Sequence, residues 1–426
     1  MHAKIQLIIK KFGILEKNCH LCITKTDYFL KNMEKESEFR CLLASYGIPN
    51  DVQILKVLRG EGAPVVLYGA SEDVADPIAK TLLKNGIKVS MILYDDETPV
   101  LTNSSLYLKD VEKVHTKDID KRVQGYHLVI GFVKGYKLFN ELIAKLKYVY
   151  TVSYLSEIFD METITHDFIF DHFYYLQDFY DRLGDERSKE SLIAYLKSKI
   201  WQDMKFLPPV FDRDMYFPKG VFELTHHESF FDCGAYVGDT IAAFLKATGG
   251  AYRRIWALEP DNANYQKLTQ YIKGEKLSKI EAISKGVYSN SGTMPFQEAG
   301  TMLSKLSEKA EHTIEVDTID HIAAGKKITF IKMDVEGAEL LALMGAEQTI
   351  RKYKPILAIS IYHKKNDLLD IPAYLKKIVP KYTFYFRTHK KLAIDSVLYA
   401  VVKKRRRKML NHKENKENSQ KTQCSV

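Results

Sequence analysis

Long apolar runs and cysteine are both scarce in this sequence of 426 residues. No stretch reaches about 18 consecutive apolar residues, the length that a membrane-spanning helix requires, so no transmembrane segment is predicted. The N-terminal stretch MHAKIQLIIKKFGILEK has too short an apolar run, interrupted by charges, for a secretory signal. The five cysteines include one Cys19-x-x-Cys22 pair, but no second pair follows at zinc-finger spacing. We therefore expect reduced thiols in a cytoplasmic protein, and we predict no metal site.

The remaining composition is that of an ordinary globular protein. Hydrophobic residues make up 46% of the chain and charged residues 27%. These values exclude a collagen and a wholly disordered chain, and they supply enough apolar side chain for a sizeable core. The length suggests two or three domains.

The net charge of +9 is concentrated at the C-terminal end. Residues 403–426 hold nine Lys or Arg and two Glu, whereas the rest of the chain is nearly neutral. A nearly neutral body argues against a specific nucleic-acid partner. Because this tail has few apolar residues, we expect it to be disordered. It serves either as a solubilising segment or as a weak contact with an anionic surface.

The N-terminal part of the chain is predicted to form a helical segment over 1–60 and a small α/β domain over 61–155. In the second of these, β-rich runs alternate with helical spacing, which predicts a parallel, Rossmann-like sheet. The strands are expected at 64–70, 89–96, 126–133 and 147–152, and the helices at 73–86 and 135–146. Its turn glycine, Gly69, and the acids Asp95 and Asp96 weakly indicate a nucleotide site. A structural, dimerising or acceptor-positioning role is the alternative.

Residues 156–225 are predicted to form a helical bridge rich in aromatic side chains. The segment 168–183 holds seven aromatics in sixteen residues, and 188–204 has helical spacing after a serine start signal. Aromatics at this density favour a packed core between domains. The alternatives are stacking against a sugar or covering an active site.

A longer α/β domain is predicted over 226–402. Strands are expected at 229–235, 254–260, 279–288, 328–334 and 355–362, and helices at 237–250, 264–274 and 338–353. The last two strands, 381–389 and 395–402, follow each other without a helix between them. This pattern predicts a mostly parallel sheet that ends in a hairpin.

Polar residues fall at the carboxyl ends of the predicted strands in this domain, where open α/β sheets bind their ligands. One strand delivers Asp232 and another Glu259. Later strands deliver Asp334 with Glu336, and His363. Scattered charges would seldom fall at four strand ends in this way, so this edge is the predicted site.

The first turn, FFDCGAYVGDT, has its glycines at Gly234 and Gly238, and Tyr236 stands where a pyrophosphate fingerprint would have a glycine. Because Asp232 would repel a phosphate, the turn suits a cationic group such as a sulfonium. Glu259, at the end of the second strand, can accept hydrogen bonds from both hydroxyls of a ribose, although a plain strand-ending turn is the alternative.

These segments, in this order and spacing, resemble the FkbM-type S-adenosylmethionine-dependent methyltransferases. The resemblance covers roughly 215–402 and includes YFP at 216–218, ALEPD, ISIYHKKNDL and DSVLYAV. Its most specific piece is K-x-D-x-E-G-A-E, from Lys332 to Glu339. The resemblance implies a class I methyltransferase fold, with a mostly parallel seven-stranded sheet and an antiparallel last strand.

The resemblance also implies where S-adenosyl-L-methionine binds. The expected cofactor residues lie in the glycine turn, at the end of the second strand, in the segment beside the adenine and in the K-x-D motif. They are Asp232, Gly234, Tyr236, Gly238, Glu259, Gly286 and Asp334. Independently of the resemblance, Glu339 is expected to stabilise the first turn of the helix that follows this motif.

Methyl transfer to oxygen needs alignment and removal of a hydroxyl proton. We predict His363 as the base, with Asp334 and Glu336 as further catalytic residues. A hydrogen-bonded loop histidine, and a helix N-terminal role for Glu336, are the alternatives. The same side chains could bind a divalent ion, but their spacing forms no compact ligand motif. Tyr216, Arg387 and His389 are candidate substrate-binding residues, and a solvated strand end is the alternative for the last two.

The predicted function is therefore O-methylation of a glycan or other hydroxylated small molecule, by a cytoplasmic protein that could be a homodimer. The glycan is implied by the resemblance alone. One alternative is a non-catalytic module that binds the cofactor for assembly or regulation. Another is a nucleotide-sugar or nicotinamide-linked enzyme that acts through the N-terminal domain, although G-x-G-x-x-G is missing from both domains.

Overall fold

The computed structural model of the protein describes residues 62–402, except 71, 97, 99, 101–104, 132–145, 154–163, 202, 298–304, 307–311 and 390–395, together with residues 55, 58 and 59. The predictions for most of 1–60, for the helix at 135–146 and for the tail 403–426 therefore lie outside the described residues. No helix in the described ranges is long and apolar enough to span a membrane.

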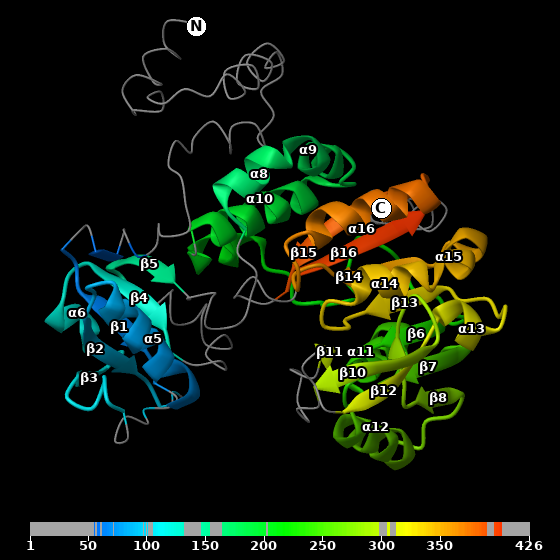
Figure 1. Ribbon diagram of the computed structural model, residues 1–426, viewed down its shortest axis with the longest axis horizontal. Coiled ribbons are helices and arrows are strands. Elements are labelled where there is room, and N and C mark those ends of the chain that lie inside the picture. Colours follow the sequence, from blue (N-terminus) through cyan, green and yellow to red (C-terminus); the bar gives the residue numbers. More distant parts are fainter. Residues whose placement is uncertain are drawn as a thin grey trace, which may run out of the picture.

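The first α/β domain is built on five parallel strands in the order β3-β2-β1-β4-β5 (Figure 1). Its elements are β1 (Val65–Tyr68), α5 (Glu72–Lys84), β2 (Val89–Tyr94), β3 (Glu112–His115), α6 (Ile119–Arg122), β4 (Tyr126–Ile130) and β5 (Val149–Ser153). The four predicted strands are present. The edge strand β3 was not predicted, because the sequence EKVH has neither an apolar run nor a β-branched majority.

Helices α8 (His166–Asp171), α9 (Phe173–Asp181) and α10 (Glu186–Trp201) form the bridge, followed by two short 3₁₀ turns, η3 (Met204–Phe206) and η4 (Pro208–Val210). They pack on the C-terminal domain beside α16 (Asp367–Ile378) and β15 (Tyr382–Thr388) (Figure 1). The ring of Phe179 lies 6.1 Å from that of Phe384, and the ring of Tyr195 lies 5.4 Å from that of Phe386. Much of the aromatic segment is thus core, while Tyr174 and Tyr175 remain exposed.

The main sheet has seven strands in the order β15-β16-β14-β13-β6-β7-β8. They are β6 (Ser229–Cys233), β7 (Arg254–Leu258), β8 (Ile280–Ile283), β13 (Phe330–Met333), β14 (Ile356–Ser360), β15 (Tyr382–Thr388) and β16 (Ser396–Val402). Strand β16 runs antiparallel to both of its neighbours, and the other pairings are parallel. The predicted class I methyltransferase fold, with its antiparallel last strand, is confirmed.

Helices cover both faces of this sheet (Figure 1). They are α11 (Asp239–Thr248), α12 (Asn262–Gly274), α13 (Ile319–Ala323), α14 (Glu339–Met344), α15 (Glu347–Tyr353) and α16 (Asp367–Ile378). The inner strands β6, β13 and β14 are buried along their length and mostly apolar, as a sheet covered on two faces requires, whereas the edge strand β8 is partly exposed.

The helix predicted over 338–353 is two helices, α14 and α15. A Cβ on Gly345 would lie 2.0 Å from the carbonyl oxygen of Tyr288, so the chain passes close to a neighbouring backbone at this point. The carboxylate of Asp320 then accepts hydrogen bonds from the backbone N–H groups of Gln348 and Thr349, at 2.9 and 2.7 Å. This cap from another element begins a new helix.

A second, four-stranded sheet was missed by the sequence analysis. Its order is β11-β10-β12-β9, formed by β9 (Gly286–Val287), β10 (Gly292–Gln297), β11 (Lys305–Leu306) and β12 (Thr313–Asp317). The strand predicted over 279–288 is therefore wrong as a single element, because its residues divide between β8 in the main sheet and β9 in this one.

Candidate active site

A tight turn joins β6 to α11 at the carboxyl edge of the main sheet. Gly234, Tyr236 and Gly238 have φ angles of 76°, 48° and 95°, in the left-handed region that favours glycine. A Cβ on Gly234 would lie 2.0 Å from the carbonyl oxygen of Asp334, so the turn runs against the end of β13. A Cβ on Gly238 would lie 2.5 Å from the ring of Tyr271. Space and conformation therefore both require these glycines.

A buried ion pair lies beneath the turn. The Nζ of Lys332 is 3.3 Å from Oδ1 of Asp232, and the two side chains are 2% and 0% exposed. The same ammonium donates to the carbonyl oxygens of Gly234, at 2.6 Å, and Cys233, at 3.3 Å. Burial raises the pKa of Asp232 to about 6, against the opposing effect of Lys332. Asp232 thus acts on the turn through Lys332, and its carboxylate is enclosed by protein.

The carboxylate that ends β7 stands beside the turn. Oε2 of Glu259 accepts a hydrogen bond from the backbone N–H of Tyr236, at 2.9 Å, and Oε1 accepts one from that of Asp261, at 3.0 Å. Burial raises the pKa of Glu259 to about 7 in spite of these two bonds. Each carboxylate oxygen retains a further lone pair. Glu259 is therefore held in place beside the turn with acceptor capacity to spare, and its contact with a ribose stays a prediction.

Asp334, Glu336 and His363 come together beyond the carboxyl ends of β13 and β14, which pair in parallel. The Nε2 of His363 lies 3.2 Å from Oε2 of Glu336 and 3.6 Å from Oδ1 of Asp334. Parallel neighbours place their carboxyl ends at one edge, which is why sequence positions about thirty residues apart meet here. These three side chains are called the acid–histidine cluster below.

The imidazole of His363 is held from behind by a buried carboxylate. Its Nδ1 lies 2.9 Å from Oε1 of Glu339, which also accepts the backbone N–H of Val335, at 2.9 Å. Burial disfavours the imidazolium, but the carboxylates of Glu339 and Glu336 outweigh it and hold the pKa of His363 well above its usual value. The two carboxylates thus favour the protonated imidazole in the free protein, and the role of His363 as the base stays a prediction.

Two tyrosines orient Asp334. The hydroxyl of Tyr216 donates to its Oδ2, at 2.7 Å, and that of Tyr362 donates to its Oδ1, at 3.3 Å. Burial opposes ionisation of Asp334, but Lys332 and His363 lower its pKa overall. Tyr216, predicted to bind substrate, therefore lies at the cluster with its hydroxyl on Asp334. No role was predicted for Tyr362 from the sequence, although its position beside His363 at the end of a predicted strand indicated that it would lie near the site.

Arg387 and His389, the other two substrate candidates, are each 4% exposed. Arg387 donates to Asp185, at 2.7 Å, and to Ser188, at 2.6 Å, near the start of α10. His389 Nε2 lies 2.7 Å from the hydroxyl of Tyr399. The contacts of Arg387 join β15 to the bridge, and that of His389 joins it to β16. Because both side chains are nearly fully buried, we do not retain the two residues as substrate contacts.

Gly286, expected beside the adenine, lies in β9. A Cβ there would come within 3.2 Å of the side chains of Ile314 and Val316, so the residue packs tightly on β12. Its contact with adenine stays a prediction.

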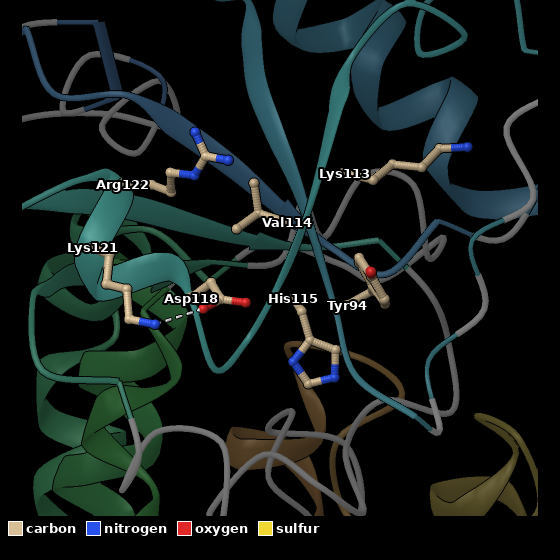
Figure 2. A pocket seen from close by; sticks show the side chains of 7 residues that line it. All are labelled: Tyr94, Lys113, Val114, His115, Asp118, Lys121 and Arg122. Atoms are coloured by element: carbon tan, nitrogen blue, oxygen red, sulfur yellow. Dashed lines mark hydrogen bonds and ion pairs between the residues drawn. The ribbon is translucent and has the colours of Figure 1, made fainter.

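The first domain has a hollow of about 390 Å³ at the ends of β2 and β3, shown in Figure 2. It is lined by Tyr94, Lys113, Val114, His115, Asp118, Lys121 and Arg122. Three of its four basic side chains already pair with carboxylates: His115 with Asp96, Lys121 with Asp118, and Arg122 with Glu112. Because little positive charge is left uncompensated, the hollow does not argue for a phosphate ligand.

The turn and Glu259 fit S-adenosylmethionine, the cofactor that the resemblance implies. The left-handed glycines let the turn pack directly against the end of β13 and the ring of Tyr271, which fixes the shape of the turn that would face the ligand. Glu259 presents acceptors to ribose hydroxyls, and the acid–histidine cluster supplies negative charge toward a sulfonium. The enclosed Asp232 would support this arrangement from below.

Comparisons with known proteins agree with this geometry. Residues 232–384 match the family model of the methyltransferase FkbM domain. The crystal structure of methyltransferase FkbM from Methylobacillus flagellatus KT is 23% identical and superposes with a TM-score of 0.61, covering 85% of this chain and 98% of that chain. This likeness shows the fold.

An rRNA methylase from Streptococcus thermophilus is 14% identical over 43% of this chain and 89% of that chain, with a TM-score of 0.29, too low to carry an argument. Comparison with curated proteins gives no match. The segment that matches the methyltransferase FkbM domain contains the glycine turn, Glu259 and the acid–histidine cluster, and it lies on the sheet described above.

Proposed function

We propose that this protein is an S-adenosylmethionine-dependent O-methyltransferase that acts on a hydroxyl group of a glycan or other small molecule. The observation that carries the proposal is the contact between the glycine turn and the end of β13, where a Cβ on Gly234 would lie 2.0 Å from the carbonyl oxygen of Asp334. This contact sets the cofactor turn directly beside the acid–histidine cluster. The FkbM family resemblance supports a glycan acceptor.

In the proposed reaction an acceptor hydroxyl attacks the methyl group of the sulfonium. The carbon–oxygen bond forms as the carbon–sulfur bond breaks, its electron pair goes to sulfur, and the products are S-adenosylhomocysteine, the methyl ether and one proton. The methyl group is already activated, so the protein must align the reactants and remove the proton. The acid–histidine cluster is the group placed for this task, because Asp334 and Glu336 offer carboxylates next to the turn.

The cofactor residues take different roles in this proposal. Glu259 accepts the ribose hydroxyls, and Gly234 and Gly238 give the turn its left-handed backbone and let it pack on β13 and Tyr271. Tyr236 covers the methionine end. The buried pair of Asp232 with Lys332 fixes the turn without touching the ligand.

A non-catalytic module that binds the cofactor is the alternative. Transfer of a labelled methyl group from the cofactor to a hydroxylated acceptor distinguishes the methyltransferase from the non-catalytic module. Tight binding of S-adenosylhomocysteine without turnover on any tested glycan or small alcohol favours the module.

Glu259→Gln is expected to weaken the binding of S-adenosylhomocysteine by about 10- to 150-fold, the scale of hydrogen bonds to a charged acceptor. The substitution keeps the shape of the side chain but replaces one acceptor oxygen with a donor. Isothermal titration calorimetry on the full chain measures it. Glu275→Gln, at an exposed carboxylate that ends α12, is the control and leaves the affinity unchanged. Equal affinities for Glu259→Gln and wild type would show that Glu259 does not contact the ligand.

The affinity for S-adenosylhomocysteine is also expected to rise with pH below about 7. Burial raises the pKa of Glu259 to about 7, with Asp261 raising it further and Lys332 lowering it. Ribose hydroxyls bond to the ionised form, so binding must expel the proton at lower pH. The dissociation constant should fall by up to about tenfold per pH unit below 7 and level off above it. The same titration on Glu259→Gln should show a flat profile; an equally steep slope would assign the effect to another group.

A further inference from the structure

The arrangement of donor atoms in the acid–histidine cluster matches a metal coordination sphere. The Nε2 of His363 lies 3.2 Å from one oxygen of Glu336 and 3.6 Å from one oxygen of Asp334, and the three atoms lie within 4.8 Å of one another. Adjacent ligands of an octahedral ion with bonds of about 2.1 Å are about 3.0 Å apart. Small shifts of the side chains would therefore bring all three atoms onto one ion.

The imidazole of His363 has a carboxylate partner on one ring nitrogen, as metal-ligating histidines usually have. Glu339 is completely buried, and its Oε1 lies 2.9 Å from Nδ1 of His363. A carboxylate on Nδ1–H fixes that tautomer and directs the lone pair of Nε2 outward, which is the usual outer-shell partner of a ligating imidazole. In this protein, Nε2 is the nitrogen that faces Asp334 and Glu336. This support is independent of the two acidic ligands.

The carboxylate of Asp334 is oriented in a similar way. The hydroxyl of Tyr216 bonds to its Oδ2 and that of Tyr362 to its Oδ1. Outer-shell hydrogen bonds of this kind fix ligating carboxylates. Two of the three donor groups thus have positioning partners of their own.

The charges at the cluster favour a cation. Three carboxylates, those of Asp334, Glu336 and Glu339, lie within ion-pair distance of the imidazole of His363, which is the one basic side chain at that distance from them among the described residues. The nearby Lys332 makes its own ion pair with Asp232. Lys332 also offsets part of the charge on Asp334, and with the imidazole as a neutral ligand the remaining negative charge favours a multivalent cation.

We propose that Asp334, Glu336 and His363 bind a divalent cation at the carboxyl ends of β13 and β14. The inference rests on the proposed function and deepens it. An ion here would coordinate the acceptor hydroxyl beside the cofactor turn and lower the pKa of that hydroxyl, so that the proton leaves to solvent as the methyl group is transferred. One imidazole nitrogen with carboxylate oxygens suits Mn²⁺ or Zn²⁺ better than Ca²⁺.

Titration of Mn²⁺ alone into the chelator-treated full chain tests the site, with free Mn²⁺ followed by electron paramagnetic resonance. We expect one specific site in the wild type, and a loss of affinity of at least tenfold in both Glu336→Gln and His363→Ala. Glu336 is partly exposed, so its variant should fold, as circular dichroism would verify. His321→Ala removes an exposed histidine that lies 3.0 Å from Asp317, and it should not change the affinity. The absence of binding at millimolar Mn²⁺, or binding that survives both cluster substitutions, would overturn the proposal.

A second pair of measurements separates this inference from the proposed function. S-adenosylhomocysteine binding and methyl transfer are measured with chelator and with added Mn²⁺. The proposal predicts that transfer falls at least tenfold in chelator while the cofactor product still binds. Transfer at the same rate in chelator overturns the metal site and leaves the methyltransferase intact. Cluster-dependent Mn²⁺ binding in a chain that binds no S-adenosylhomocysteine overturns the proposed function and leaves the metal site intact.

Discussion

Lys332→Met should lower the free energy of unfolding by about 3–5 kcal/mol, because it leaves the fully buried carboxylate of Asp232 without its partner. The substitution also removes the hydrogen bonds from Nζ to the carbonyl oxygens of Gly234 and Cys233. The cofactor turn should loosen as a result. Chemical denaturation of the full chain measures the loss, and S-adenosylhomocysteine binding reports on the turn.

Two further variants show whether the ion pair is responsible. Lys327→Met removes an exposed lysine five residues away and should change the stability by less than about 0.5 kcal/mol. Asp232→Leu combined with Lys332→Met removes both charges and should recover a large part of the lost stability. A double variant as unstable as Lys332→Met would show that the loss comes from packing or from the carbonyl contacts.

His363→Gln should reduce kcat for methyl transfer by about 10²- to 10⁴-fold, the usual contribution of a group that handles the substrate proton. The expectation holds whether His363 takes the proton itself or binds an ion, since both roles require Nε2 between Asp334 and Glu336. Affinity for S-adenosylhomocysteine should change by less than about threefold, because Glu259 and the glycine turn are untouched. Steady-state transfer of labelled methyl, with calorimetry beside it, gives both quantities.

His321→Gln provides the matched control. His321 lies 3.0 Å from a carboxylate of Asp317, as His363 lies near carboxylates of its own, but its side chain is exposed and its ion pair is with Asp317 rather than with the cluster. Its kcat should equal that of the wild type. A His363→Gln enzyme with kcat within threefold of the wild type would remove the cluster from the proposed chemistry.

The sheet of the C-terminal domain was predictable because its strands are buried on both faces. Runs such as SFFDC and PILAIS have no alternating polar face, and each is followed by a turn signal. The small sheet of β9 to β12 was not predictable in the same way. Its strands include GTMPFQ, with Gly292 and Pro295, and its pairing depends on partners that are remote in the sequence.

The candidate site, too, could be predicted from the sequence only in part. Parallel strands bring their carboxyl ends to one edge, so the meeting of Asp334, Glu336 and His363 followed from the strand assignment. Burial did not follow from it. Asp232 and Arg387 both ended predicted strands, yet their side chains are enclosed by ion pairs with Lys332 and Asp185. Sequence spacing gives the end of a strand but not the partner that a side chain finds there.

Glu339 has one contact that could be predicted from the sequence and one that could not. Its place in K-x-D-x-E-G-A-E indicated a stabilised turn, and it does accept the backbone N–H of Val335. Its second contact, with Nδ1 of His363, crosses from one strand end to the next and has no signature in a single segment.

A crystal structure of the full chain with S-adenosylhomocysteine is the decisive test of the proposed cofactor site. We expect the ribose hydroxyls on the carboxylate of Glu259, the homocysteine moiety along the turn at Gly234, and the sulfur facing Asp334 and His363. A nucleoside bound elsewhere, or no nucleoside at the turn at saturating concentrations, would show that this edge of the sheet is not the cofactor site.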